Sequence, residues 1–404
     1  MSTVERDPRL VKPDNSLGGH LSATGRRIAG GELGSLPVII GLILTWIVFM
    51  ILNDRFLSAL NLTNLMLQIA ATGTIAVGVT FVLLLGEIDL SVGSVSGVTS
   101  AVLAVLVTRA GWGDWAAVAF AVLVGVVIGL LHGTMFTKLR MPAFVVTLAG
   151  LIGWQGLQLY VLGQGGSINL PDGPVTNLTD QFFVPSYGWG FAALCVAGFA
   201  AVQFTRRHAR TRAGLPTSSI ALPILQVVGL AVVLAVIVAV LNADRGVPMV
   251  IIVYLVIIAV CAFILRRTTF GRHLFAVGGN IEAARRAGIR VDGIRIAAFT
   301  ISSGLAAVGG IFAASRLTAV TQSTGSGEVL LYAIAAAVIG GTSLFGGRGS
   351  VWSALLGMLV IGSISNGLDL LSVSAAVKFM VTGLVLVVAV LLDSLSRRGQ
   401  PLRR

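Results

Sequence analysis

Long apolar runs alternate with short polar connections along most of the chain. Twelve runs predict membrane-spanning helices, because about 20 apolar residues cross a bilayer as a helix. The predicted spans are 36–52, 65–85, 92–108, 115–137, 143–162, 189–205, 217–241, 248–265, 296–320, 329–345, 350–371 and 375–392. Hydrocarbon offers no water to the backbone, so each run must satisfy its own peptide groups. The pattern predicts an all-α, polytopic transmembrane bundle, in which the shorter runs allow tilted, broken or re-entrant segments.

Composition and charge agree with a membrane protein. Only 11% of the 404 residues are charged and 56% are hydrophobic, whereas soluble domains carry roughly 25% charged residues. A net charge of +12 suggests nucleic acid in a soluble protein. Here, placing both termini in the cytoplasm puts 23 of the 28 Lys and Arg residues on the inner side, as the positive-inside rule requires. The charge therefore predicts orientation, and no nucleic-acid partner is expected.

The spans define three regions. Residues 1–35 are polar and predict a disordered cytoplasmic tail without a signal peptide. Residues 36–393 form the predicted transmembrane domain, and 394–404 form a basic cytoplasmic tail. Two glycine-rich breaks, GEIDLSVG and GGTSLFGGRGS, interrupt the units 65–107 and 329–362 in the same orientation. Transporters often contain such structural repeats, although glycine-rich breaks are also common by chance.

The segment 271–293 is the longest charged interruption in the second half of the chain. Asn280 is placed to cap a short helix, and Glu282 lies in its first turn, where the helix dipole favours an acid. Gly288 is placed to end the helix in the left-handed conformation. A helix over 281–287 is too short to be stable alone, so we expect it to lie on the membrane surface and meet another protein.

Two motifs carry a family resemblance. Glu282, Ala283, Ala284 and Gly288, with Arg285 inside the helix, match E-A-A-x-x-x-G and resemble the loop by which permease subunits of bacterial ABC importers touch their ATPase. The alternative is an ordinary basic loop. The second motif, Gly86 to Gly93, is similar to the G-x-I-D-L-S-V-G signature of ribose and xylose permeases; its signature positions include Gly86, Asp89, Ser91 and Gly93. Together the motifs favour the permease family over residues 36–393.

The resemblance implies a multi-pass permease subunit of an ATP-driven importer in the bacterial inner membrane. It implies a monosaccharide substrate delivered by a periplasmic or lipid-tethered sugar-binding protein, usually two permease copies, and a separate ATPase subunit. The length, and an extra peripheral pair of spans over 217–265, resemble xylose more than ribose permeases. In this family the outer loop 163–188 is either a solvated connector, which we favour, or a docking surface for the binding protein.

Catalytic motifs are missing from the sequence. A phosphate-binding loop needs Gly-Lys followed by Ser or Thr, and none of Lys12, Lys138 and Lys378 follows a glycine. The sequence also lacks G-x-S-x-G, and its histidines are too scattered for a metal motif. We therefore expect no enzyme, no metal and no cofactor in this chain, with ATP bound by the partner subunit.

Polar residues at membrane depth leave several readings open. Glu87 and Asp89 are either solvated at the interface or in contact with substrate; Asp89 is also placed to cap a helix that starts at Ser91 or Val92, the role we favour. A further set has side chains suited either to sugar hydroxyls or to bonds across helices: Gln155, Gln158, Asn366 and Asp369. The rival function is an ion-gradient-driven secondary transporter using Glu87 or Asp89. Within the ABC class, ribose, another sugar or branched-chain amino acids are alternatives.

Overall fold

The computed structural model describes residues 36–215 and 219–398, most of which lie in helices. The chain divides into a larger unit, Gly34–Phe182 with Pro248–Leu395, and a smaller unit that includes Phe183–Val247. The predicted tail 1–35 lies outside the described residues, as do 399–404 of the predicted basic tail.

Within the described residues, every predicted span overlaps a helix, although several bounds differ. The larger unit contains α2 (Leu36–Leu52), α3 (Ala59–Leu84), α4 (Val92–Thr108), α5 (Asp114–Thr137), α6 (Ala143–Leu162), β1 (Ser167–Asn169), α7 (Pro174–Asp180), α10 (Met249–Arg267), α11 (Thr269–Gly279), α12 (Ile281–Arg286), α13 (Val291–Leu317), β4 (Ala319–Thr321), α14 (Gly327–Ile339), α15 (Val351–Leu370) and most of α16 (Ala375–Arg398). The smaller unit contains α8 (Pro185–Arg212) and α9 (Ala221–Asn242). The short strands β2 (Phe182–Phe183) and β3 (Val247–Pro248) lie where the chain passes between the units.

Membrane-crossing length separates these helices into two groups. Among the described residues, eight helices are long and apolar enough to cross a bilayer. Four apolar stretches are shorter: Leu36–Leu52, Val92–Thr108, Gly327–Ile339 and Ala375–Val385. The all-α, multi-pass membrane fold is therefore confirmed. The count of twelve spans and the cytoplasmic termini stay predictions.

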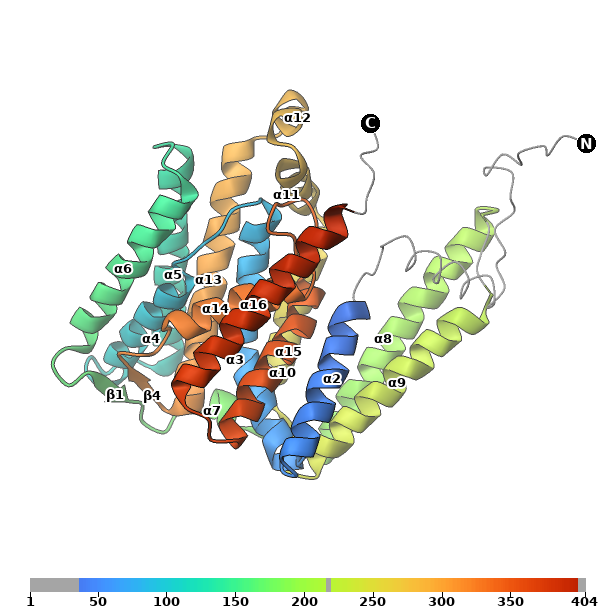
Figure 1. Ribbon diagram of the computed structural model, residues 1–404, viewed down its shortest axis with the longest axis horizontal. Coiled ribbons are helices and arrows are strands. Elements are labelled where there is room, and N and C mark those ends of the chain that lie inside the picture. Colours follow the sequence, from blue (N-terminus) through green and yellow to red (C-terminus); the bar gives the residue numbers. More distant parts are fainter. Residues whose placement is uncertain (1–35, 216–218, 399–404) are drawn as a thin grey trace, which may run out of the picture. The chain divides into compact units, whose positions relative to one another are not determined.

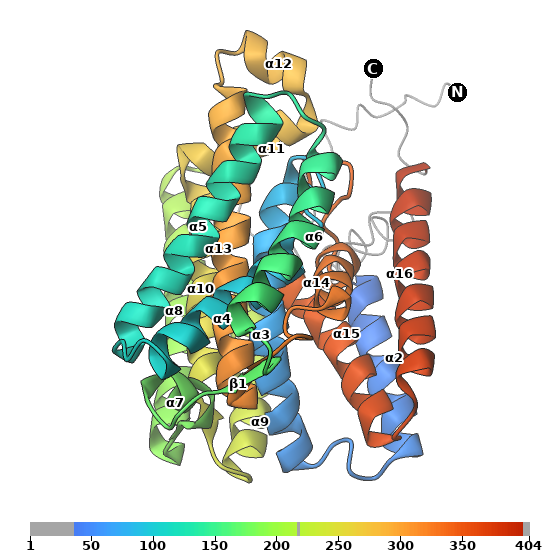
Figure 2. The same cartoon turned by 90° about the vertical axis from the view of Figure 1, so that its left-hand side faces the viewer.

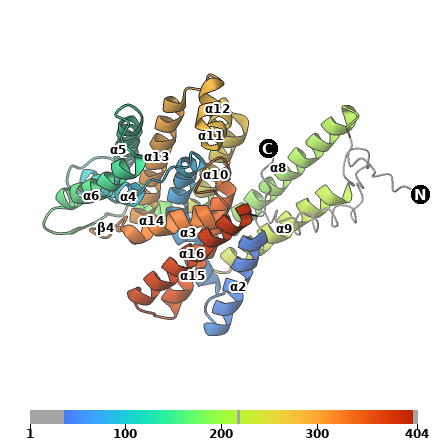
Figure 3. The same cartoon turned by 45° about the horizontal axis from the view of Figure 1, so that its top comes forward.

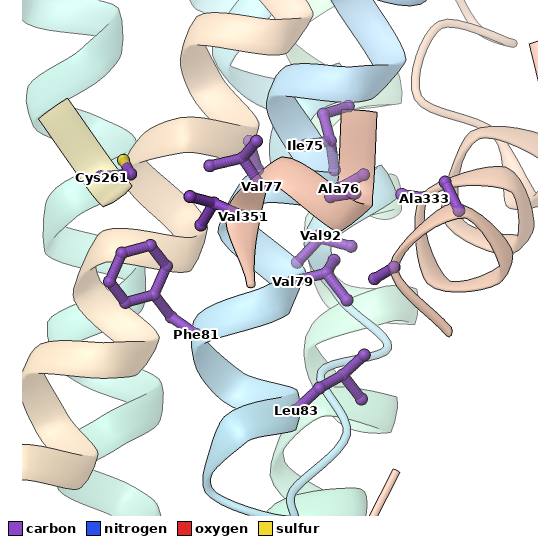
Figure 4. Packing of buried hydrophobic residues seen from close by; sticks show 14 of the residues in the cluster. Ile75, Ala76, Val77, Val79, Phe81, Leu83, Val92, Cys261, Ala333 and Val351 are labelled. Atoms are coloured by element: carbon purple, nitrogen blue, oxygen red, sulfur yellow. The ribbon is translucent and has the colours of Figure 1, made fainter. Parts of the chain in front are cut away.

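Helices α3 and α13 form the centre of the larger unit (Figure 2). Small residues let their backbones approach, as is common between membrane helices. A Cβ on Gly78 of α3 would lie 2.9 Å from the Ser302 carbonyl oxygen of α13. Around them the core is apolar: Figure 4 shows Val79 and Phe81 of α3 with Val351 of α15 and Cys261 of α10. Helix α3 is the most enclosed of the eight candidate spans among the described residues, with 89% of its apolar stretch buried.

Helix α10 corrects one sequence interpretation. Residues 217–265 were expected to form an added pair at the periphery, but α10 packs on α3 in the main core. Its Tyr254 and Ile258 are fully buried. The peripheral interpretation is therefore wrong for α10. Helix α9 instead pairs with α8 in the smaller unit, where Gln203 Nε2 donates to Gln226 Oε1 over 2.7 Å.

The larger unit has structured segments at both ends. Helix α12 protrudes at one end, and β1, β4 and α7 lie at the other (Figure 1). Strand β1 pairs antiparallel with β4, with Ile168 opposite Val320. The backbone N–H of Thr179 in α7 donates to Ser315 Oγ of α13 over 3.2 Å. The expectation of a solvated connector over 163–188 is wrong for these buried positions, because they bury apolar side chains against the bundle.

Candidate coupling site and glycine-rich break

Helix α12 has the start and end predicted from the sequence. Asn280 Oδ1 accepts a hydrogen bond from the Ala283 N–H over 2.9 Å, which satisfies one free donor of the first turn. Glu282 lies in that turn. Gly288 follows the helix with φ +79°, and the Ile289 N–H donates to the Ala284 carbonyl over 3.0 Å, the pattern of a left-handed cap. The predicted capped helix is confirmed.

One face of α12 is anchored and the other is free for contact. Ala284 is buried, and the flanking Ile281 and Ile289 pack against the main core. Glu282, Ala283 and Arg285 point outward and are exposed. Arg285 pairs with Glu282 over 3.1 Å, a surface pair of small energetic value. The helix therefore presents a short, rigid surface of mixed polarity beyond the bundle.

Two arms hold α12, namely α11 before it and the first turns of α13 after it (Figure 3). Thr268 caps α11 by accepting from the Gly271 N–H over 3.2 Å. Leu274 and Val277 bury one face of α11 in the core. Helix α11 was not predicted from the sequence, because most of it lies in the segment 271–293, which was interpreted as a charged interruption.

The GEIDLSVG segment forms the break between α3 and α4. Asp89 is 1% exposed, and its Oδ1 accepts from the Ser91 N–H over 2.9 Å and the Ser91 hydroxyl over 2.6 Å. Helix α4 starts at Val92. Asp89 therefore holds Ser91, the residue directly before α4, but no side chain caps a donor of the first turn of that helix. The interpretation of Asp89 as a solvated carboxylate is wrong, because the residue is buried. Oδ2 of Asp89 finds no hydrogen-bond partner within the described part of the chain.

A buried polar chain continues from Asp89 into two further helices. His132 Nδ1 of α5 lies 3.3 Å from the Ser91 hydroxyl, and Trp154 Nε1 of α6 donates to His132 Nε2 over 2.9 Å. Because the indole can only donate, we assign the histidine proton to Nδ1, facing Ser91. All donors then point toward the Asp89 carboxylate. Sequence reasoning missed His132 and Trp154, since they lie in separate apolar runs.

Glu87 connects the same break to α13. Its carboxylate lies 3.4 Å from Arg295 Nη2, and the guanidinium also stacks over the Phe136 ring at 4.6 Å. Partial burial raises the pKa of Glu87, while the Arg295 cation opposes that rise. Glu87 is therefore held in a paired, half-buried position at the α12 end of the unit.

A basic cleft of about 830 Å³ adjoins this position, between the α5–α6 connection and the start of α13. Its lining includes Lys138, Arg140, Arg285 and Arg295, with Asp292 as a carboxylate. Lys138 pairs with Asp292 over 3.3 Å. The cleft and the exposed face of α12 share Arg285, so they form one continuous polar surface.

The other sequence-predicted polar residues do not gather at one place. Gln158 donates to the Thr321 and Thr324 carbonyls over 3.0 and 2.9 Å, and Gln155 is exposed on the same helix. Asn366 exchanges two hydrogen bonds with Asn61 of α3, and the exposed Asp369 pairs with Lys378. Gly93, by contrast, packs at the start of α4, where a Cβ would lie 2.8 Å from the Gly325 carbonyl oxygen.

Known proteins resemble this chain over nearly its whole length. The family model described as "Branched-chain amino acid transport system / permease component" matches residues 61–390. The xylose transport system permease protein XylH of Escherichia coli (strain K12) is 35% identical over 89% of this chain and 90% of its own. The ribose import permease protein RbsC of Bacillus subtilis (strain 168) is 32% identical over 90% of this chain and 94% of its own. No solved structure matches the chain.

A multi-pass helical bundle with a protruding, doubly capped E-A-A-x-x-x-G helix is the architecture of a membrane permease component. With the matches above, the chain belongs to the family of ABC transport permeases of the ribose and xylose type. The resemblance read from the two motifs is confirmed. The second motif starts near the arms of α12, where Glu87 pairs with Arg295, and ends at Gly93, which packs against Gly325 after β4.

Proposed function

We propose that this chain is the membrane-spanning subunit of an ATP-driven importer in the bacterial inner membrane that moves xylose or a similar monosaccharide into the cytoplasm. Two copies form the pathway, an external binding protein delivers the sugar, and a separate ATPase supplies energy. The observation that carries this proposal is α12: its anchored face and its exposed Glu282, Ala283 and Arg285 fit a contact with a partner subunit.

The substrate class rests on the relatives. XylH of Escherichia coli is named for xylose and RbsC of Bacillus subtilis for ribose. The identity to XylH is 35% and that to RbsC is 32%, which favours a xylose-like pentose. Reconstitution of the chain in proteoliposomes with its ATPase and binding protein tests this proposal. Uptake of labelled xylose that requires ATP and the binding protein is expected, with ribose as the comparison sugar.

The rival is a secondary transporter driven by an ion gradient. Glu87 and Asp89 give it two carboxylates in the break between α3 and α4, but Glu87 is paired with Arg295, and Oδ1 of Asp89 accepts from Ser91. That rival also leaves the capped helix α12 without a role. Uptake by this chain alone under an ion gradient, without any ATPase, would decide for the rival.

Gly288 tests the coupling role of α12. Its positive φ costs a side chain roughly 1–2 kcal/mol, and Gly288→Asp adds a negative charge at the negative end of the helix dipole. We expect Gly288→Asp to insert normally but to lose sugar uptake and co-purification of the ATPase. Gly288→Asn is the matched control, because asparagine tolerates the left-handed conformation and adds no charge.

The two variants separate coupling from a passive connection. Gly288→Asn should keep most uptake. If Gly288→Asp transports at the wild-type rate with its ATPase bound, α12 is only a connector and the assignment must be abandoned.

A further inference from the structure

Resting on the proposed function, we propose that movement of the ATPase passes through α12 to the break between α3 and α4. Both arms of α12 contact the 84–87 segment of that break. Gly278 in the first arm and Arg295 in the second are then positioning residues for transport. The proposal concerns how movement leaves α12, so it goes beyond the assignment of α12 as the contact itself.

The first grip is a contact between backbones. The Gly347 N–H donates to the Leu84 carbonyl oxygen over 2.9 Å, and Gly278 of α11 lies against the same carbonyl. A Cβ on Gly278 would overlap the Leu84 oxygen and lie 2.8 Å from the Gly347 nitrogen. Only glycine therefore permits this approach of α11 to the end of α3.

Gly346 completes this contact. It has φ +82°, and a Cβ there would lie 2.7 Å from the Gly278 carbonyl oxygen and 2.8 Å from the Gly86 nitrogen. We call Gly86, Gly278, Gly346 and Gly347 the glycine junction. It joins the two glycine-rich breaks of the chain to α11 without intervening side chains. Close-packed backbone of this kind transmits displacement because it has little room to compress.

The second grip is the Glu87–Arg295 pair, 3.4 Å apart, with side chains only 23% and 14% exposed. Such partly buried pairs are screened less by salt than surface pairs. Arg295 follows α12 and Gly278 precedes it, so the chain of α12 is tied to the break on both sides. A shift of α12 cannot be taken up by one flexible arm alone.

The break leads to the interior of the larger unit. On one side it continues α3, the most enclosed candidate span. On the other it holds Asp89 and Ser91, whose polar chain reaches His132 of α5 and Trp154 of α6. Displacement of the break therefore acts on α3, α4, α5 and α6 together, through contacts that the structure contains.

The test compares neighbouring glycines. A Cβ on Gly279 would meet no atom of the described residues within 4 Å, and Gly279 is exposed, so Gly279→Ala is the matched control for Gly278→Ala. Both variants, in proteoliposomes with the ATPase and binding protein, are assayed for ATPase co-purification, ATP hydrolysis and xylose uptake. We expect Gly278→Ala to bind the ATPase and hydrolyse ATP, with xylose uptake per ATP at least tenfold lower. Gly279→Ala should match wild type.

The outcomes separate this proposal from the proposed function. Wild-type uptake per ATP in Gly278→Ala overturns the inference, as does joint loss of ATPase binding and uptake. If Gly278→Ala fails to reach the membrane, Glu87→Gln decides: reduced uptake per ATP with the ATPase bound supports the inference, and an unchanged ratio overturns it. Wild-type protein that takes up neither xylose nor ribose with ATP would instead refute the proposed function.

Discussion

Single residues in this protein are predictable where their partners are close in sequence. Asn280, Glu282 and Gly288 each act on the nearest end of the short helix α12, so capping rules place them correctly. Asn366 differs, because its partner Asn61 is 305 positions away. The sequence left two roles open for it, a sugar contact or a bond across helices. The structure shows the bond across helices, and the sugar-contact role stays a prediction for Asn366, as it does for the three others: Gln155, Gln158 and Asp369.

The Asn61–Asn366 pair makes a measurable prediction. Each amide donates to the other, over 2.8 and 3.0 Å, and both residues are buried. Asn366→Leu removes the donor to Asn61 Oδ1, while Asn61 Nδ2 keeps its bond to the Phe56 carbonyl. The change should lower the free energy of unfolding in micelles by about 1 kcal/mol, the usual size for such bonds in membranes. Unfolding of Asn61→Leu, Asn366→Leu and the double variant gives the coupling energy.

The double variant should lose less stability than the sum of the single variants. Gln155→Leu is the control, since Gln155 is exposed and its loss should leave stability nearly unchanged. Strictly additive losses would mean that the two amides do not interact. Loss of sugar uptake without loss of stability in Asn366→Leu would support a sugar-contact role for Asn366.

Whole elements follow the hydrophobic pattern when they are long. Each predicted span overlaps a helix, because the backbone of a continuous apolar run in a bilayer can form its hydrogen bonds only within the helix. The short elements α7, β1 and β4 were not predicted, because they are stabilised by contacts with α13 and α4 that no local sequence pattern reveals. Helix α3 starts at Ala59, earlier than the predicted 65, because Ser58 caps it by accepting from the Asn61 N–H.

The start of α4 tests the role of Asp89. Asp89→Ala removes the acceptor for both Ser91 donors and should destabilise the protein by about 1 kcal/mol, the usual net value of a hydrogen bond. Asp89→Asn keeps the Oδ1 acceptor and should cost less. Thermal unfolding in detergent measures both. Equal losses in the two variants would show that the charge of Asp89, and not its hydrogen bonds to Ser91, matters at this position.

The whole molecule is oriented by its charges. Basic residues of the cleft and of α12 lie at one end of the larger unit, whereas β1, β4 and α7 lie at the opposite end (Figure 1). The positive-inside rule therefore predicts that α12 faces the cytoplasm, where ATP is present. This orientation was inferred from the sequence by counting charges. The packing of α10 in the core was not, because the hydropathy of a span does not say which helix it contacts.

The smaller unit allows a direct test of this orientation. Helices α8 and α9 pair through Gln203 and Gln226, and their ends expose Ala213 after α8 and Ala243 after α9. With four arginines near the end of α8, the Ala213 side is expected to be cytoplasmic.

In a background with Cys195 and Cys261 replaced by serine, Ala243→Cys should react with a membrane-impermeant maleimide in intact cells. Ala213→Cys should react only after the membrane is opened. The reverse labelling pattern would invert the predicted topology and place the Ala213 end of α8 on the outer side.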